Sequence, residues 1–435
     1  MADTSATTSA TTGAAGTAAG TAAGTAAGTA AGTAAGTAAG TAAGTAAGPG
    51  AGASTAEPDA IVIGAGPGGL AAAAALQRRG VRTLVLERSD AVGASWRQHY
   101  DRLHLHTTRR LSSLPGFAIP RAYGRWVGRD NVVRYLEQYT EAHDLDIATG
   151  IEVSRIERAP EGTEGWALPA TGGRRLSARA VVIATGTNHT PRVPDWPGRD
   201  TYGGELLHAS GYRNGKPYEG RDVLVVGVGN TGAEIAVDLV EAGAARVRLA
   251  VRTPPHIMRR STAGWPAQAT GILVRRLPTG LVDRIAPYVE RISVPDLSEY
   301  GLPRPDNGLY SRVLDGSIPV QDVGLIAAVR ARKVEPVAAV ESFDGHEVLL
   351  ADGSRITPDA VIAATGYRNG LEPLVGHLGV LNGRGRPTVH GSRTPKEAPG
   401  LYFTGYTNPI SGMFREMAID AERIAKSVAK AVAKR

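Results

Sequence analysis

Hydrophobic and polar positions follow the same order in two separate stretches of the chain. Each stretch begins with a short, wholly apolar run, at 60–63 and at 223–226, which is typical of a buried strand in a parallel sheet. A glycine-rich loop, an apolar segment of helical length and a second apolar run follow in both. This order predicts two βαβ units, and therefore an α/β protein with two dinucleotide-binding, Rossmann-like domains.

Two further segments, 166–186 and 347–366, also resemble each other. Each contains a hairpin that leads into an apolar strand ending in Ala-Thr-Gly, and each follows one of the glycine loops. We interpret this doubled order as one nucleotide-binding domain inserted into another, discontinuous one. The expected boundaries are 56–193 and 326–435 for the two parts of the outer domain and 194–325 for the inserted domain.

The first 55 residues are of a different kind. Residues 16–47 are eight copies of Gly-Thr-Ala-Ala, without a large apolar side chain. Nothing in such a run offsets the entropy lost on ordering it, and each glycine costs a helix about 1 kcal/mol relative to alanine. We therefore expect residues 1–55 to be a disordered, low-complexity N-terminal tail with no part in catalysis.

The other end of the chain predicts an amphipathic helix. Ile424, Val428 and Val432 fall on one stripe, and lysines occupy other positions around the helix. Docking of this stripe on the outer domain is the ordinary interpretation. A basic helix that lies on a membrane surface is the alternative.

Composition narrows the function classes. Of the 435 residues 42% are hydrophobic, which is enough for two or three ordinary cores. The net charge is +7, but no dense basic run marks a nucleic-acid partner, and attraction of anionic cofactors and substrates explains the surplus better. The absence of cysteine excludes disulfides, thiolate metal sites and a dithiol redox pair. We expect no metal, no membrane span and a cytoplasmic location.

The loop 64–69 has the glycine spacing of a phosphate-binding turn. Gly64 permits the tight turn, Gly66 lets backbone N–H groups approach a pyrophosphate, and Gly69 allows the helix to pack closely. Glu87 ends the next strand, where its carboxylate can accept hydrogen bonds from ribose hydroxyls. A plain turn beside a surface glutamate is the alternative.

The loop 227–232 repeats the spacing, but no acid follows where Glu87 follows the first loop. Counted from the first glycine, the matching position is Ala250, and Arg252 comes two residues later. A guanidinium there suits a 2′-phosphate, so the inserted domain is expected to prefer NADPH to NADH. An uninvolved surface arginine is the alternative.

A third motif lies between the two loops and contains Tyr202, Gly204, His208 and Tyr212 at the spacing Y-x-G-x-x-x-H-x-x-x-Y. It resembles the fingerprint of the class B flavin-dependent monooxygenases, in which phenylalanine stands first. The tyrosine at 212 resembles the heteroatom-oxidising and YUCCA-type branches, whereas the Baeyer–Villiger branch carries tryptophan there. We expect His208 to shape the connection between the domains and not to act as an acid or base.

The resemblance extends over residues 59–435 and implies both cofactors and a reaction. Features similar to the YUCCA-type indole-3-pyruvate monooxygenases lie at 86–90, 96–106, 223–234 and 364–368. The family places FAD in the outer domain and NADPH in the inserted one. A C4a-(hydro)peroxyflavin then transfers one oxygen atom from O2 to a small organic substrate.

The substrate does not carry over, because the segments 107–110 and 404–413 depart from the family pattern. An arylpyruvate, which would undergo oxidative decarboxylation, and a soft nitrogen or sulfur nucleophile are both open. Two other functions share the loops: an NADPH oxidase or quinone reductase without substrate oxygenation, and a degenerate protein that binds a nucleotide without turnover. The oligomeric state is open as well.

The resemblance also implies individual site residues. His106 is the expected catalytic residue, beside the flavin, with a structural histidine as the alternative; Trp96 either faces the flavin or fills the core. The expected cofactor-binding residues are Gly64, Gly66, Pro67, Gly68, Gly69, Glu87, Ser95, Trp96, Ala184, Thr185, Gly186, Gly204, His208, Tyr212, Gly227, Gly229, Asn230, Thr231, Gly232, Arg252, Thr365, Gly366 and Gly405.

Overall fold

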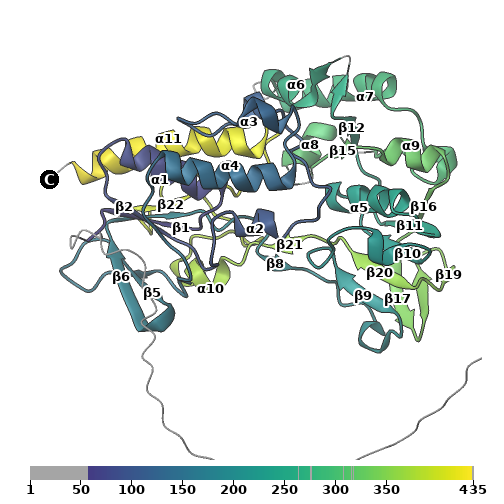
Figure 1. Ribbon diagram of the computed structural model, residues 1–435, viewed down its shortest axis with the longest axis horizontal. Coiled ribbons are helices and arrows are strands. Elements are labelled where there is room, and N and C mark those ends of the chain that lie inside the picture. The colour runs from purple at the N-terminus through teal and green to yellow at the C-terminus, as the bar shows by residue number, and fades with distance from the viewer. Residues whose placement is uncertain are drawn as a thin grey trace, which may run out of the picture. The chain divides into compact units, whose positions relative to one another are not determined.

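Two five-stranded sheets organise the part of the chain that the computed structural model describes (Figure 1). The described residues are 57–262, 264–274, 277–306, 308–314, 316 and 318–433. The predicted N-terminal tail, 1–55, lies outside them.

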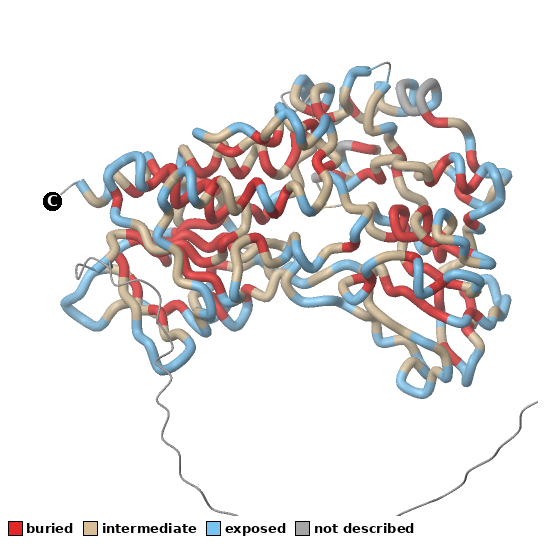
Figure 2. Tube along the Cα trace, viewed as in Figure 1, coloured by how far each residue is buried: buried red, intermediate tan, exposed pale blue. Residues whose placement is uncertain are grey.

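The first sheet has the strand order β22-β7-β1-β2-β3, and every pair in it is parallel. Its strands are β1 (Ala60–Ile63), β2 (Thr83–Leu86), β3 (Ile147–Ala148), β7 (Ala180–Ile183) and β22 (Leu401–Phe403). Strands β1 and β7 are buried along their whole length, as Figure 2 shows for this core, so their uniform apolar runs match a sheet covered on both faces.

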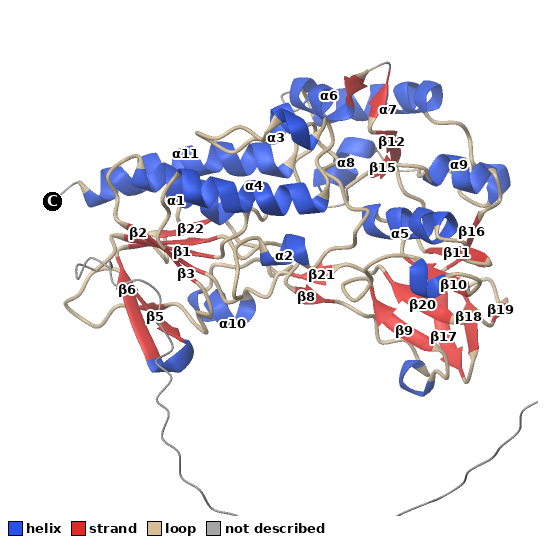
Figure 3. Cartoon of the chain, viewed as in Figure 1, coloured by secondary structure: helices blue, strands red, loops and turns tan. Residues whose placement is uncertain are grey.

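Helices cover one face of this sheet, and a three-stranded antiparallel sheet with a short helix covers the other (Figure 3). The helices are α1 (Pro67–Gln77), α4 (Arg129–Ala142) and α11 (Met413–Val432). The opposite face carries β4 (Glu157–Arg158), β5 (Trp166–Ala170), β6 (Arg174–Ala178) and α10 (Glu372–Val375). Ile424 and Val428 of α11 are fully buried in the core cluster that contains α1. The expected docking of the C-terminal stripe on the outer domain is therefore confirmed.

The second sheet has the order β16-β11-β10-β20-β9 and is also parallel throughout. Its strands are β9 (Glu205–His208), β10 (Asp222–Val226), β11 (Arg246–Val251), β16 (Val334–Ala338) and β20 (Ala360–Ala363). Helices α5 (Asn230–Glu241) and α9 (Leu325–Arg330) pack on one face. On the other face packs the meander β17 (Val340–Asp344), β18 (Glu347–Leu350) and β19 (Arg355–Ile356). The two domains thus repeat one layered plan.

The structure corrects the predicted boundary between 325 and 326. Strands β16 and β20 lie beyond that boundary and pair within the second sheet, so the inserted domain continues to Gly366. The chain leaves the first domain at β8 (Thr190–Pro191) and returns at β21 (Tyr367–Arg368), and these two strands pair antiparallel. The prediction was wrong because an apolar run identifies a buried strand but not the sheet that it joins.

The remaining elements are mostly short, apart from the 15-residue helix α7, and about half of them lie between β11 and β16. They are α2 (Ala94–Arg97), α3 (Arg109–Ser112), α6 (Ala267–Val274), α7 (Thr279–Ser293), α8 (Leu309–Leu314), β12 (Ile257–Arg259), β13 (Ser261–Thr262), β14 (Trp265–Pro266), β15 (Val320–Asp322), η1 (Arg121–Tyr123), η2 (Thr171–Gly173), η3 (Arg199–Thr201), η4 (Lys216–Tyr218), η5 (Ser298–Tyr300) and η6 (Gly376–Leu378). Among the described helices, none combines the length and the apolar character needed to cross a bilayer.

Replacement of Gly232 by alanine should destabilise the second domain. A Cβ at this position would lie 1.9 Å from the carbonyl oxygen of Gly227, so helix and loop must separate. Overpacking of this kind costs about 3 kcal/mol, and urea unfolding should show the loss. Gly280→Ala on α7 is the control, since nothing lies within 4 Å of its Cβ position. Equal unfolding free energies for Gly232→Ala and the wild type would contradict the close packing.

Candidate active site

The two glycine loops have the same backbone geometry. Gly64 and Gly227 adopt φ angles of 103° and 107°, in the left-handed region that favours glycine. A Cβ at either would lie 2.7 Å from a carbonyl oxygen, that of Ala184 in the first domain and that of Ala364 in the second. Each Ala-Thr-Gly turn therefore packs directly on its own loop, as the doubled sequence order suggested.

The helix that follows each glycine loop has an open N-terminus. Gly66 and Gly229 precede α1 and α5 as N-cap residues, and neither helix has a side-chain cap. A Cβ at Gly66 or Gly229 would meet nothing within 4 Å. Gly186 and Gly366, at the ends of the two turns, are equally open and have φ angles of 81° and 83°. Free N–H groups at a helix start are suited to a pyrophosphate.

Polar groups of the first domain fit a bound dinucleotide. The carboxylate of Glu87 is buried and accepts hydrogen bonds from the backbone N–H groups of Ala65 at 2.8 Å and Ser89 at 2.9 Å. It lies beside the loop, where the ribose of a dinucleotide is expected. The Thr404 hydroxyl is buried without a hydrogen-bond partner in the described part of the chain, and its methyl lies 3.5 Å from the Cβ position of Gly68. A ligand at the loop would supply the missing partner.

Two further predicted residues of the first domain lie near the loop. Ser95 and Trp96 belong to α2, and the N–H of Gly93, just before this helix, donates to the carbonyl of Ala65 at 3.0 Å. Ser95 is exposed. The Trp96 ring is partly buried and packs edge-on against Phe414, with the ring centroids 5.8 Å apart.

On the other side of the loop, the Thr185 hydroxyl is 2.7 Å from the hydroxyl of Tyr406. Gly405 adopts a φ angle of 85° in the turn that precedes α11. This turn therefore contacts the first Ala-Thr-Gly turn.

In the second domain the strand register shifts the predicted equivalence by one residue. The N–H of Gly64 donates to the carbonyl of Leu86, and the N–H of Gly227 donates to that of Ala250. The position that matches Glu87 is therefore Val251 and not Ala250, because α5 has 12 residues and α1 has 11. Neither Ala250 nor Val251 is acidic, so no carboxylate takes the place of Glu87 in the second domain. Arg252 is exposed and forms no ion pair within the described ranges, so its guanidinium is available to an anion.

Asn230 has a structural contact that the sequence did not indicate. Its side-chain amide donates to the carbonyl of Pro319 at 3.2 Å, and its oxygen accepts from the N–H of Gln321 at 2.7 Å. The side chain thereby ties the second glycine loop to β15. The side-chain oxygen of Gln321 is buried and lacks a partner among the described residues.

His208 connects the fingerprint motif to the interdomain crossing. The N–H of Ser210 donates to Nδ1 at 3.0 Å, so Nε2 carries the proton and donates to the carbonyl of Gly366 at 3.0 Å. Burial lowers the pKa of this imidazole. Since Gly366 directly precedes β21, His208 contacts the point at which the chain returns to the first domain.

Tyr212 and Gly204 serve packing within the second domain. Tyr212 is buried, and its hydroxyl donates to the carboxylate of Asp238 on α5 at 2.6 Å. A Cβ at Gly204 would lie 2.6 Å from the ring of Tyr202. These contacts fix the motif on the domain core, and none of them joins a glycine loop.

His106 meets a buried carboxylate from the other domain. Its Nε2 forms a hydrogen bond with Oε1 of Glu234, which lies on α5 and has a side chain only 3% exposed. A carboxylate only accepts, so Nε2 carries the proton. Glu234 was not among the predicted site residues, although it lies in the segment 223–234 that resembles the family. A charged residue one turn into an apolar helix could have indicated it.

Other polar groups also face Glu234. Tyr100 lies within hydrogen-bonding reach of Glu234 and Thr231, and burial, followed by the charge of Glu234, raises the pKa of its hydroxyl. Burial lowers the pKa of Arg260, and Glu234 opposes this shift. The Arg260 guanidinium stacks on Trp126, 4.3 Å from the ring centroid. The carboxylate is thus balanced by cationic and hydroxyl groups instead of water.

The chain before His106 is attached to the second domain. Tyr100 packs in that domain's core cluster, at a ring-centroid distance of 6.4 Å from Tyr212. The N–H of Asp101 donates to the carbonyl of Arg213, and Arg102 donates to the carbonyl of Val323 at 3.1 Å. A segment that precedes the first crossing therefore spans both domains and carries His106 with it.

Comparison with known proteins identifies this arrangement. The model of the family described as pyridine nucleotide-disulphide oxidoreductase matches residues 61–264. The chain is 37% identical to indole-3-pyruvate monooxygenase YUCCA1 of Oryza sativa subsp. japonica over 80% of this chain and 87% of that protein. It is 33% identical to the probable indole-3-pyruvate monooxygenase YUCCA9 of Arabidopsis thaliana over 85% of this chain and 88% of that one.

Solved structures agree with the sequence comparison. The flavin-containing monooxygenase from Stenotrophomonas maltophilia matches with a TM-score of 0.65 and 25% identity, over 86% of this chain and 99% of that one. Cyclohexanone monooxygenase shares the fold, with a TM-score of 0.65 at 19% identity over 87% of this chain and 88% of that one.

The paired domains and these similarities define a flavin-dependent monooxygenase. Within that class, the chain belongs to the YUCCA-type family of class B flavin-dependent monooxygenases. The disulfide chemistry named by the matching family model is excluded here, because the sequence has no cysteine.

Gly229→Ala should weaken NADPH binding at least tenfold and leave the fold intact. The new methyl meets no protein atom within 4 Å, but it projects where a pyrophosphate approaches the start of α5. Fluorescence titration with NADPH measures the effect, and the FAD content and melting temperature serve as controls. Gly227 is the poorer position to test, since its methyl would meet the Ala364 carbonyl. Unchanged NADPH affinity would show that this loop does not bind NADPH.

Proposed function

We propose that the chain, acting in the cytoplasm, catalyses NADPH-dependent oxidative decarboxylation of an arylpyruvate. One oxygen atom of O2 enters the carboxylate product and the other leaves as water: arylpyruvate + O2 + NADPH + H⁺ gives arylacetate + CO2 + NADP⁺ + H2O. The single observation that carries the substrate class is the similarity to relatives named indole-3-pyruvate monooxygenases, which spans both domains.

The two cofactors are assigned to the domains by their loops. FAD belongs at Gly66, Glu87 and the orphaned Thr404 hydroxyl of the first domain, and it supplies hydride acceptance and oxygen activation when bound. NADPH belongs at Gly229 of the second domain, with Arg252 near the position of a 2′-phosphate. Both loops offer uncapped helix starts, which supports the assignment.

His106 and Glu234 act between these two sites. Glu234 holds the proton on Nε2 of His106 and fixes the ring orientation, which leaves Nδ1 as the nitrogen free to meet substrate or an oxygen atom. Because Glu234 sits on the helix of the NADPH loop, the orientation of His106 depends on the placement of that loop. The pair keeps the proton on Nε2, away from the reacting centre, and it helps to exclude water from that centre.

The test of the function is product formed per NADPH consumed. With phenylpyruvate or indole-3-pyruvate, the holoenzyme should form the arylacetate and CO2 in a ratio to NADPH close to one. With amines and sulfides of similar size, the ratio of oxygenated product to NADPH consumed should stay low. Stopped-flow mixing of NADPH-reduced enzyme with oxygen should also show a long-lived spectral species between reduced and oxidised flavin.

Two outcomes would contradict the proposal. Complete conversion of NADPH into H2O2 with every substrate would favour the alternative, an NADPH oxidase or quinone reductase. Oxygenation of the amines or sulfides alone would support a monooxygenase but rule out an arylpyruvate as its substrate.

Glu234→Gln should lower the coupling ratio about tenfold, equivalent to about 1.4 kcal/mol. The amide keeps the shape but removes the charge that defines the proton on Nε2 of His106. Product and H2O2 are measured together, and ¹⁵N spectra of the His106 ring report the tautomer independently of turnover.

Asp238→Asn is the matched control on the same helix. Its carboxylate accepts from Tyr212 and does not contact His106, so the variant should lose stability without losing coupling. Equal losses of coupling in both variants would mean that Glu234 has only a structural role.

A further inference from the structure

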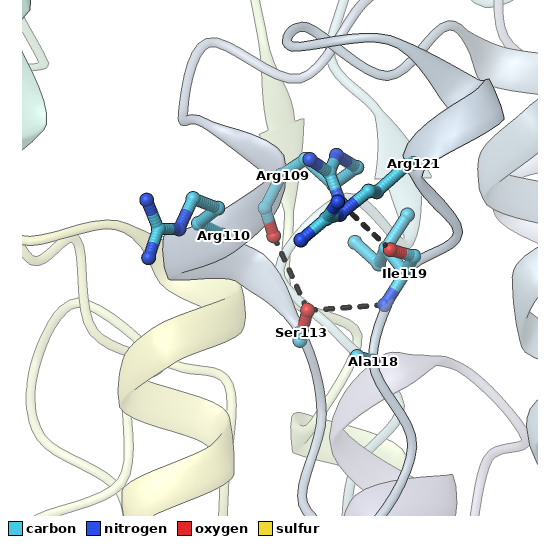
Figure 4. A pocket seen from close by; sticks show the side chains of 6 residues that line it. All are labelled: Arg109, Arg110, Ser113, Ala118, Ile119 and Arg121. Carbon is cyan, nitrogen blue, oxygen red and sulfur yellow. Dashed lines mark hydrogen bonds between the residues drawn. The ribbon is translucent and has the colours of Figure 1, made fainter.

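We propose that a hollow between α3 and η1, outside both glycine loops, is a binding site for a small organic carboxylate. The hollow has a volume of about 530 Å³, within the range of small-molecule sites. Its lining consists of Arg109, Arg110, Ser113, Ala118, Ile119 and Arg121. Figure 4 shows the six lining side chains, of which Arg109, Arg110 and Arg121 carry guanidinium groups.

The positive charge of the hollow is uncompensated. None of the three arginines forms an ion pair within the described part of the chain. The carboxylates of Asp101 and Asp130 instead pair with Arg129, at 2.7 and 2.8 Å. Unpaired guanidinium groups that line one hollow repel each other. An anion between them would turn this repulsion into attraction.

One of the guanidinium groups is already oriented. Arg109 donates through Nε to the carbonyl of Gly124 and through Nη1 to that of Ile119, both at 3.1 Å. Both partners are neutral, so the full charge remains, and the other N–H groups stay available. Preorganisation of this kind lowers the entropy that a ligand must offset.

The apolar part of the lining favours an organic carboxylate over an inorganic phosphate. Backbone N–H groups commonly bind phosphate, but the N–H of Ile119 already donates to Oγ of Ser113 at 3.1 Å, and that hydroxyl donates to the carbonyl of Arg109 at 3.2 Å. The donors left are guanidinium forks, which bind carboxylate and phosphate groups alike. The exposed Ala118 gives the hollow an apolar wall, and an inorganic ion would leave most of the volume to water. An aryl or alkyl carboxylate uses both features.

The experiment is calorimetric titration of the oxidised full-length holoenzyme with phenylacetate. We expect saturable binding that the uncharged phenylacetamide does not reproduce and that inorganic phosphate does not match. Arg121→Gln should weaken the binding at least tenfold, and Arg110→Gln should weaken it less. Ala118→Asp, which places a carboxylate at the wall, should abolish it. Each altered side chain is exposed, so the fold should survive.

Two controls separate this hollow from the flavin site. Arg134→Gln removes an exposed arginine of α4 that does not line the hollow, and it should leave the affinity unchanged. His106→Gln should also leave it unchanged. Three results would overturn the proposal: equal affinity in wild type and Arg121→Gln, loss of binding in His106→Gln alone, or phosphate binding as tight as that of phenylacetate. None of these results bears on the coupling ratio, so the proposed reaction stands or falls separately.

Discussion

The absence of a side chain at Gly69 and Gly232 is the constraint on which both nucleotide sites depend. In each loop a Cβ would lie 1.9 Å from the carbonyl oxygen of the first glycine, a distance that no real methyl group adopts. This close approach sets the start of the helix directly against the end of the central strand. Both helix starts lack a side-chain cap, and a Cβ at Gly66 or Gly229 would meet no atom within 4 Å, so both starts are open to an incoming phosphate.

The two sites are joined by one buried charge. Glu234 is nearly inaccessible to solvent and belongs to the helix that begins at the second loop, yet its partner His106 comes from the first domain. Burial of a carboxylate costs several kcal/mol unless it is paired and hydrogen-bonded. The contact with His106, together with the nearby Tyr100 and Arg260, offsets that cost only while both domains keep their places. The orientation of His106 and the association of the domains therefore depend on the same interaction.

Much of the architecture was predictable from local sequence pattern. Uniform apolar runs identified β1, β7, β10 and β20, and the glycine spacing identified both loops, since each of these signals comes from neighbouring residues. The predicted interdomain boundary was wrong. Strands β16 and β20 join the second sheet by pairing with β11 and β10, which lie far away in the sequence.

The sequence by itself determined that two Rossmann-like units are present, where their glycine loops lie, and which residue types surround them. Only the tertiary structure decided which strands close each sheet, that Val251 and not Ala250 matches Glu87, and that Glu234 faces His106. The physical reason is the range of each interaction. Turn and helix signals act over a few residues, whereas the partner of a buried charge or of a parallel strand is fixed by packing between distant segments.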